Sequence, residues 1–221
     1  MSSLITLALF LLAKVLYKKF RCIIFIPVFF AVVGGILIIS FSPLSFDRYF
    51  LENRSITFML GPAVVSLGVL LYKQLPIIRS HFKSLLLTIL CSSCISALSV
   101  VVLTGILDLP TKLSASLLPL GITTPIAIEV VKPLEGNPSI TSVVVIGVGL
   151  FGNLVSPYIL RWFKVDWDPA KGLALGQSSH GIGTARAVEI SESTGTFSGL
   201  AMTLNGVITV FTAPLIWSIF H

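Results

Sequence analysis

Long apolar segments separated by short polar turns organise the chain. The segments run approximately over residues 3–17, 22–42, 55–72, 84–107, 113–131, 139–160, 172–190 and 196–219. Several of them approach or exceed the roughly 18 to 20 residues that a helix needs to cross about 30 Å of hydrocarbon. Because lipid offers no partners to backbone polar groups, the pattern predicts an all-α, polytopic membrane helical bundle.

The composition also favours a membrane protein. Of the 221 residues, 55% are hydrophobic and 11% are charged, and the mean hydropathy is +1.00, which leaves too little polar surface to cover a soluble globule. The net charge of +6 comes from basic residues dispersed between apolar segments, whereas a nucleic-acid-binding protein would gather them on one face. Three cysteines cannot form a disulfide framework, and we expect Cys22, Cys91 and Cys94 to be small buried residues.

The second half of the chain contains a repeat. The pattern Gly121-Ile122-x-Thr124-x-x-Ala127-x-Glu129 matches Gly181-Ile182-x-Thr184-x-x-Ala187-x-Glu189, sixty positions later. The match continues with a three-residue deletion and pairs Gly149 with Gly206. We expect a single membrane domain over 1–221, with N-terminal spans in 1–110 and a duplicated unit in 111–221 whose copies cover 111–163 and 170–221.

One segment in each copy carries signals that interrupt a helix. Pro119 and Pro125 lack a backbone donor and disfavour helix at the preceding residue, so the first helix should stop near Pro119 and restart at Pro125. In the second copy, we expect Gly181 and Gly183 to supply the conformational freedom for a break. A weaker signal is Pro62 after a glycine, which marks a helix start or kink.

The positions of lysine and arginine favour segments that enter and leave the membrane on one side. If all eight segments cross, the two sides carry eight and six basic residues, which is a poor bias. If 113–131 and 172–190 are re-entrant, the count becomes ten against four. The two copies then point in opposite directions, the inverted-repeat arrangement of many secondary transporters. A helix that crosses but is broken at its middle is the alternative, and it makes the copies parallel.

Two such breaks predict a cavity, because non-helical backbone at membrane depth must be buried in protein or line water. The N-terminus of each outgoing half-helix offers free N–H groups and a partial positive charge, which suit an anionic group. We expect a pocket for a small carboxylate, formed by Thr123, Thr124, Ser178, Ser179, His180, Gly181, Gly183, Thr184 and Arg186. The alternative for each hydroxyl is that it only caps its own helix, as Ser178, Ser179 and Thr184 could.

Arg186 is the most informative candidate, because an arginine inside the membrane costs at least about 2.5 kcal/mol unless it is paired or hydrated. Glu189 lies three residues on and could pair with it in a bond that has no substrate role. His180 has an ordinary pKa of about 6.5 that suits proton coupling, but it could instead bond a neighbouring carbonyl.

Three further polar residues are candidates for coupling or support. Glu129 is the counterpart of Glu189 and either takes protons or faces the surface beside Lys132. Asn153 and Asn205 lie mid-segment, where buried amides usually bond between helices, so we interpret them as structural first and cavity-lining second. No catalytic set, nucleotide loop, metal cluster or cofactor motif stands out, and we expect a protein that is not an enzyme.

Four stretches are similar to one known family: Leu60-Gly61-Pro62-Ala63-Val64, Leu117-Leu118-Pro119-x-x-x-Thr123-Thr124-Pro125-Ile126-Ala127, Ser179-His180-Gly181-Ile182-Gly183-Thr184-Ala185-Arg186-Ala187 and Phe197-Ser198-Gly199-Leu200-Ala201-Met202. They resemble the LrgB/CidB family of bacterial membrane proteins over nearly the whole chain. The resemblance implies a multi-pass protein of the bacterial cytoplasmic (inner) membrane that forms homo- or hetero-oligomers.

Two functions come with this resemblance. The first is an antiholin- or holin-like regulator of murein hydrolase activity and cell lysis, which acts with a small membrane protein of the LrgA/CidA type. The second is transport of small monocarboxylates such as pyruvate, glycolate or glycerate, as implied by the similar C-terminal part of the chloroplast glycolate/glycerate transporter. We favour transport of a small organic anion, since broken helices and a membrane-embedded arginine suit a binding site. An inactive interaction subunit is a further alternative.

Overall fold

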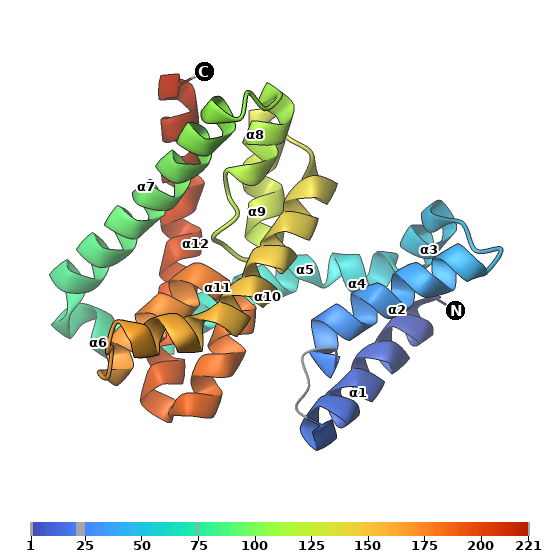
Figure 1. Cartoon of the computed structure of the whole chain (residues 1–221), viewed down its shortest axis with the longest axis horizontal. Coiled ribbons are helices and arrows are strands. Elements are labelled where there is room, and N and C mark those ends of the chain that lie inside the picture. Colours follow the sequence, from blue (N-terminus) through green and yellow to red (C-terminus); the bar gives the residue numbers. More distant parts are fainter. Residues whose placement is uncertain (1, 21–24, 74, 221) are drawn as a thin grey trace. The chain divides into compact units, whose positions relative to one another are not determined.

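The structure is a computed structural model that describes residues 2–20, 25–73 and 75–220 (Figure 1). These residues form helices, turns and short connections, with no strand among them. The chain divides into two compact units, Met1–Ala63 and Val64–His221. The all-α class predicted from the apolar segments is confirmed.

The first unit is built on two antiparallel apolar helices, α1 (Ser2–Phe20) and α2 (Pro27–Phe41). Two short helices, α3 (Phe46–Glu52) and α4 (Arg54–Phe58), follow, and α5 (Leu60–Lys73) begins with Pro62 in its first turn. Pro62 therefore marks a helix start, which is one of the two alternatives, a start or a kink, that the sequence predicted. The Glu52 carboxylate accepts hydrogen bonds from the backbone N–H and the hydroxyl of Ser2, both at 2.8 Å, and these bonds lower the pKa of Glu52 to about 2.

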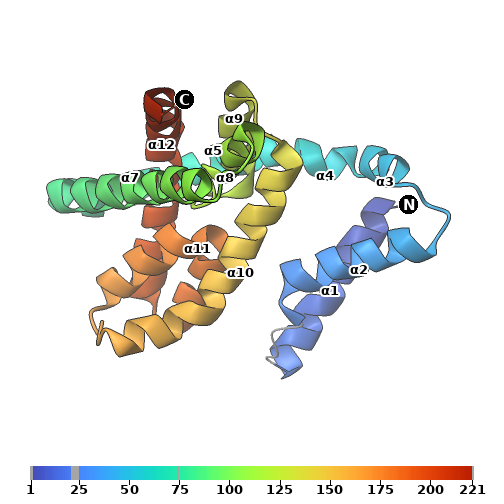
Figure 2. The ribbon, with the colours of Figure 1, turned by 45° about the horizontal axis from the view of Figure 1, so that its top comes forward.

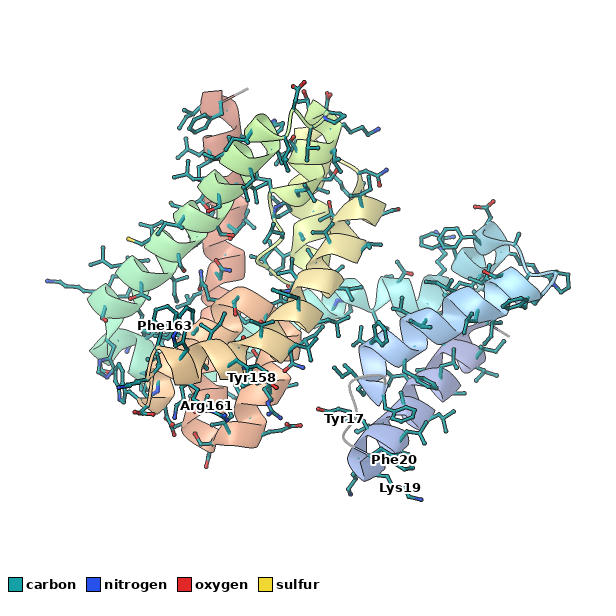
Figure 3. All side chains as sticks on the ribbon, viewed as in Figure 1. Tyr17, Lys19, Phe20, Tyr158, Arg161 and Phe163 are labelled. Atoms are coloured by element: carbon teal, nitrogen blue, oxygen red, sulfur yellow. The ribbon has the colours of Figure 1, made fainter. Side chains whose placement is uncertain are left out.

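Three helices of the second unit are long and apolar enough to cross a membrane: α7 (Phe82–Ile106), α10 (Pro138–Trp162) and α12 (Glu192–Phe220). Large apolar side chains on them are exposed, for example Leu103, Phe151 and Phe211, as expected of surfaces that face lipid. The side chains of Tyr158, Arg161 and Phe163 mark the C-terminal end of α10 (Figure 3), where aromatic and basic residues suit the headgroup region. A short helix, α6 (Leu75–Ser80), precedes α7.

The first interrupted segment is a helical hairpin. Helix α8 (Thr111–Leu117) ends two residues before Pro119, and α9 (Thr124–Val131) begins one residue before Pro125, so both predicted boundaries are confirmed. Beyond α9, a 3-10 turn (Lys132–Leu134) leads back to α8, where the Ser116 hydroxyl accepts a hydrogen bond of 2.7 Å from the Asn137 backbone N–H. Because this bond brings the end of the segment back beside its first arm, we call residues 111–137 hairpin 1.

The second interrupted segment, α11 (Asp168–Ile190), is also a hairpin. Its backbone leaves the helical conformation at His180, where φ is 37° and ψ is −123°. The Ser191 hydroxyl, just past the end of the helix, donates a 2.7 Å hydrogen bond to the Asp168 carboxylate at its start. This bond lowers the pKa of Asp168, and Lys171 adds to the effect. We call residues 168–191 hairpin 2.

The two hairpins open at opposite ends of α10. Hairpin 1 leads directly into the first residue of α10, and hairpin 2 follows its last turn. Figures 1 and 2 show α8 and α9 near the start of α10, and α11 near its end. If α10 crosses the membrane, the hairpins enter from opposite sides.

Candidate functional site

The tip of hairpin 1 lies against the first arm of hairpin 2, close to the break in that hairpin, inside the second unit. The tip of hairpin 1 is the non-helical stretch 118–123, and the tip of hairpin 2 lies at His180. A Cβ atom added to Gly121 would lie 3.9 Å from the carbonyl oxygen of Gln177 and 3.4 Å from the hydroxyl of Ser96. The region predicted as a shared site is therefore formed by both copies of the repeat and by α7.

A chain of buried polar side chains holds the tip of hairpin 1. Asn205 on α12 donates a 2.8 Å hydrogen bond to the carbonyl of Gly121 and accepts one from Thr209. The hydroxyl of Ser93 on α7 bonds Thr209 and Thr212, each at 3.1 Å. Asn205 thus has the structural role expected first, because its amide satisfies a carbonyl that the broken helix leaves without an internal partner.

The start of α9 keeps unused hydrogen-bonding capacity. Thr123 occupies the N-cap position, but its side chain makes no capping hydrogen bond. Its Oγ1 atom is buried and has no hydrogen-bond partner in the described residues. The same is true of Oε1 of Gln177 and Oδ1 of Asn153. A buried hydroxyl without a partner costs about 1–3 kcal/mol, so an oxygen- or nitrogen-bearing ligand near Thr123 would recover that energy.

The break in hairpin 2 differs from the prediction. We expected Gly181 and Gly183 to adopt the unusual backbone conformation, but no described glycine has a positive φ and His180 carries the break instead. A non-glycine residue in this region is strained by about 1–3 kcal/mol. Its ring is buried and its Nε2 atom bonds the carbonyl of Val145 on α10 at 3.0 Å, which fixes the strained residue.

Gly183 has a different role, which is to let the two arms of hairpin 2 approach. A Cβ atom on Gly183 would overlap the carbonyl oxygen of Leu175 on the opposite arm. The expected caps also bond elsewhere, since the Ser178 hydroxyl donates to the carbonyl of Ala174 at 2.7 Å and the Thr184 hydroxyl bonds Ser198 at 2.9 Å. These hydroxyls tie hairpin 2 to itself and to α12.

The charged candidates lie in local pairs. Arg186 and Glu189 form an ion pair of 2.8 Å, with side chains 41% and 50% exposed, and this is the intrahelical alternative considered for Arg186. Glu129 pairs with Lys132 at 2.6 Å and is exposed, which matches the surface alternative for Glu129. The structure therefore brings Thr123, Ser179 and His180 into the interior but leaves Arg186 half-exposed.

Helix α10 approaches hairpin 2 through two glycines. A Cβ atom on Gly149 would lie 2.6 Å from the His180 ring, and one on Gly152 would overlap the hydroxyl of Ser179. Gly206 on α12, which the sequence repeat pairs with Gly149, lies against Ile126 of hairpin 1 in the same way. Each paired glycine therefore contacts the hairpin of the other copy.

Sequence reasoning missed the contribution of α7. A cavity of about 370 Å³ lies between α7, the first arm of α11 and α12. It is lined by Ser84, Thr88 and Ser92 on α7 and reaches Gln177. The four-residue spacing of these hydroxyls, continued by Ser96, was the available signal.

The cysteines of α7 lie on another part of its surface. Cys91 is exposed, so the expectation that it is buried is wrong. Cys22 lies outside the described residues.

Comparison with known proteins identifies the family. The sequence model of the LrgB-like family matches residues 6–219. This chain belongs to the LrgB-like family. Both interrupted segments, α10 and α12 lie within the matched region, so the hairpins are part of the family's shared region rather than an addition to it.

Several relatives of this LrgB-like chain match over most of their length. It is 35% identical over 219 residues to the uncharacterized protein YwbG of Bacillus subtilis, which covers 98% of this chain and 96% of that protein. It is 32% identical over 192 residues to the antiholin-like protein LrgB of Bacillus cereus, which covers 87% of this chain and 84% of that protein. No solved structure is significantly similar to it. Family membership and the apolar helices together establish a membrane protein.

Proposed function

We propose that this protein transports a small organic anion, such as a monocarboxylate, across the bacterial inner membrane. The observation that carries the proposal is the approach of the hairpin 1 tip at Gly121 to Gln177, three residues before the break in hairpin 2 and next to the uncapped start of α9. Broken helices whose N-termini point into a protein interior bind the carboxylates of transported substrates in other secondary transporters. Thr123, with its unpaired hydroxyl, is the side chain best placed to bind the carboxylate.

The hairpin geometry supports an inverted repeat within this proposal. The hairpins open at opposite ends of α10, and each of the paired glycines, Gly149 and Gly206, contacts the hairpin of the other copy. A pseudo-two-fold axis in the membrane plane would relate the copies in this way. With both segments re-entrant, ten basic residues lie on the cytoplasmic side and four outside, which agrees with the usual bias.

The second candidate function is an antiholin-like control of cell lysis, with a small LrgA-type membrane protein as partner. The observation that favours it is the printed name of the Bacillus cereus relative, antiholin-like protein LrgB. A regulator of this kind acts through association, and oligomers with itself or its partner are part of both proposals. The two functions make different predictions for the flux of solutes across a membrane.

Uptake into proteoliposomes tests the proposal. Radiolabelled pyruvate, glycolate and glycerate are offered to vesicles with and without the partner, and release of a size-graded dye is measured in parallel. We expect saturable uptake without dye release. Dye release that increases with protein content, without saturable uptake, would contradict transport and support a pore.

Two substitutions make this test specific. Thr123→Val keeps the shape of the side chain and removes a buried unpaired hydroxyl, so stability should be unchanged or higher while uptake efficiency falls about tenfold. Arg186→Ala should abolish uptake if the guanidinium binds the anion after leaving Glu189. Thr104→Val is the control for Thr123, because the Thr104 hydroxyl is buried on α7 and bonds the carbonyl of Val100. Arg161→Ala is the control for Arg186.

A further inference from the structure

The 370 Å³ cavity between α7, α11 and α12 is separate from the polar chain that holds hairpin 1. We propose that this cavity is a water-filled vestibule through which the small organic anion reaches the hairpin tips from the cytoplasmic side. The identity of the solute rests on the proposed transport function. The presence of water in the cavity and the side from which it enters do not depend on the transport function.

The walls of the vestibule are set by two helical spacings. On α7, Ser84, Thr88 and Ser92 recur every four residues and so lie along one face. On the first arm of α11, Ala170, Ala174 and Gln177 form the opposite wall. The α7 wall therefore carries a row of hydroxyls and the α11 wall two alanines, while Leu85, Leu173 and Phe197 make much of the remaining lining apolar.

The outer end of the vestibule lies at the start of both helices. His81 directly precedes α7 and Trp167 directly precedes α11, and both line the cavity. The exposed basic residues Arg79 and Lys83 flank His81 in the sequence. A positive mouth raises the local concentration of an anion. The same loops carry the basic excess assigned to the cytoplasm, which sets the side on which the vestibule opens.

The inner end lies at Gln177, three residues before the break in hairpin 2. Gln177 lines the cavity, and its backbone carbonyl is the atom of hairpin 2 that lies next to Gly121. Its side-chain N–H group donates to the carbonyl of Ile89 at 3.4 Å, which leaves the buried Oε1 atom without a partner. Ser96, the next residue of the hydroxyl series, also lies beside Gly121.

Water fits this cavity better than a lipid chain does. Its lining includes Gln177, whose side-chain oxygen is buried and has no partner in the described residues. An acyl chain would leave the hydroxyls of Ser84 and Thr88 facing hydrocarbon, whereas Ser92 bonds the carbonyl of Ile89 in its own helix. The volume falls within the range of about 300–1,000 Å³ that small-molecule sites occupy.

Thiol labelling tests the vestibule. Single cysteines replace Ser84, Thr88 or Ser92 in a chain that has Cys22, Cys91 and Cys94 changed to serine. A charged, membrane-impermeant methanethiosulfonate is applied to inverted vesicles and, separately, to intact cells. The matched control keeps only the native Cys91, which is exposed at the same depth of α7 but does not line the cavity.

We expect the three introduced cysteines to react at least about tenfold faster than Cys91 in inverted vesicles, and slowly in intact cells. Reaction only with a lipid-soluble maleimide would overturn the proposal and indicate a lipid-filled cavity. Equal rates at Cys91 and Ser92→Cys would also overturn it, as would faster labelling from outside the cell.

A second measurement links the vestibule to transport. Labelling of Ser92→Cys with a bulky charged reagent should reduce uptake at least about fivefold, whereas labelling of Cys91 should leave it unchanged. Unchanged uptake after complete labelling of Ser92→Cys would overturn the access role. If the unlabelled protein transports none of the three acids, the transport proposal fails while the labelling rates still decide whether the cavity holds water.

Discussion

His180 is the residue on which the break in hairpin 2 depends. It holds a left-handed backbone conformation that glycine adopts readily, yet two glycines lie one and three residues further on in ordinary conformations. The bond from its ring to the Val145 carbonyl explains why histidine occupies this position. The backbone strain lowers the stability of the protein and the bond to Val145 raises it, and substitutions at His180 can separate the two effects.

Replacing His180 should show both effects. His180→Ala loses the bond to Val145 and keeps the strain, so we expect a loss of roughly 1–3 kcal/mol in stability. His180→Gly loses the same bond but relieves the strain, and it should be about 1 kcal/mol more stable than His180→Ala. Thermal unfolding in detergent measures the difference. If His180→Gly is the less stable of the two, the backbone at this position is not strained.

At the residue scale, the sequence identified the polar residues near the breaks but not their bonds. Ser178, Ser179 and Thr184 are typical caps, but Ser178 bonds the carbonyl four residues earlier in its own helix, and a tertiary contact directs Thr184 to Ser198. Gln177 was not predicted, because nothing local distinguishes a glutamine at a hairpin tip from one in an ordinary helix. The partner of Gln177 lies on α7 and that of Thr184 on α12, outside the helix that carries them.

At the element scale, close packing of hairpin 2 against α10 depends on glycines. Gly149 and Gly152 face His180 and Ser179 so closely that a methyl group would overlap them, whereas a methyl group on Gly147 would meet nothing within 4 Å. These three residues lie within two turns of one helix. The same substitution at Gly147 and at Gly149 therefore differs mainly in whether the new methyl group faces hairpin 2.

Alanine substitutions in α10 should separate packing from helix propensity. Gly149→Ala must displace the His180 ring and should cost about 1–3 kcal/mol, with loss of uptake. Gly147→Ala should be neutral or stabilising by up to about 1 kcal/mol, because alanine favours helix. Thermal unfolding and uptake of both variants check this. Equal effects of the two substitutions would contradict the close contact between α10 and hairpin 2.

The base of hairpin 2 depends on ionised Asp168. Its pKa is lowered by the Ser191 hydroxyl first and by Lys171 second, so the folded state binds the proton less readily than the unfolded state. The bond therefore contributes stability above the ordinary pKa of about 3.8, and this contribution is lost as the pH falls through the lowered value.

We expect acid to open hairpin 2 at its base. Amide protection at residues 168–172 and 191–195, corrected for intrinsic exchange rates, should fall between pH 6 and pH 3. Asp168→Asn, which cannot ionise, should be less protected at pH 6 and should change little with pH. A pH response in Asp168→Asn equal to that of the original protein would assign the effect to another group.

At the scale of the whole molecule, the two hairpins bear on the proposed re-entrant topology. In hairpin 2 the bond between Asp168 and Ser191 joins the two ends of the segment, and in hairpin 1 the bond between Ser116 and Asn137 brings the end of the segment back beside α8. The parallel arrangement of two broken but crossing helices required the ends of each segment to lie apart. The hairpins therefore favour the proposed re-entrant topology over two broken helices that cross.

Surface labelling checks this topology. In a chain without native cysteines, Glu135→Cys at the base of hairpin 1 should react with an impermeant reagent in intact cells. Asp166→Cys, just before hairpin 2, should react only after the cells are opened. Both positions are exposed and lie outside the helices, so accessibility should not limit either reaction. Labelling of both positions from the same side would contradict opposite hairpins.

The sequence by itself determined the helical class, the membrane setting and the place of the first interruption. The first two follow from the length of the hydrophobic segments, and the third follows from backbone constraints at Pro119 and Pro125, which act locally. The tertiary structure decided that the interruptions are hairpins, that His180 carries the second break, that Arg186 pairs with Glu189, and that α7 lines a cavity. Those outcomes depend on contacts between segments distant in the chain, where packing and hydrogen-bond satisfaction outweigh local preference.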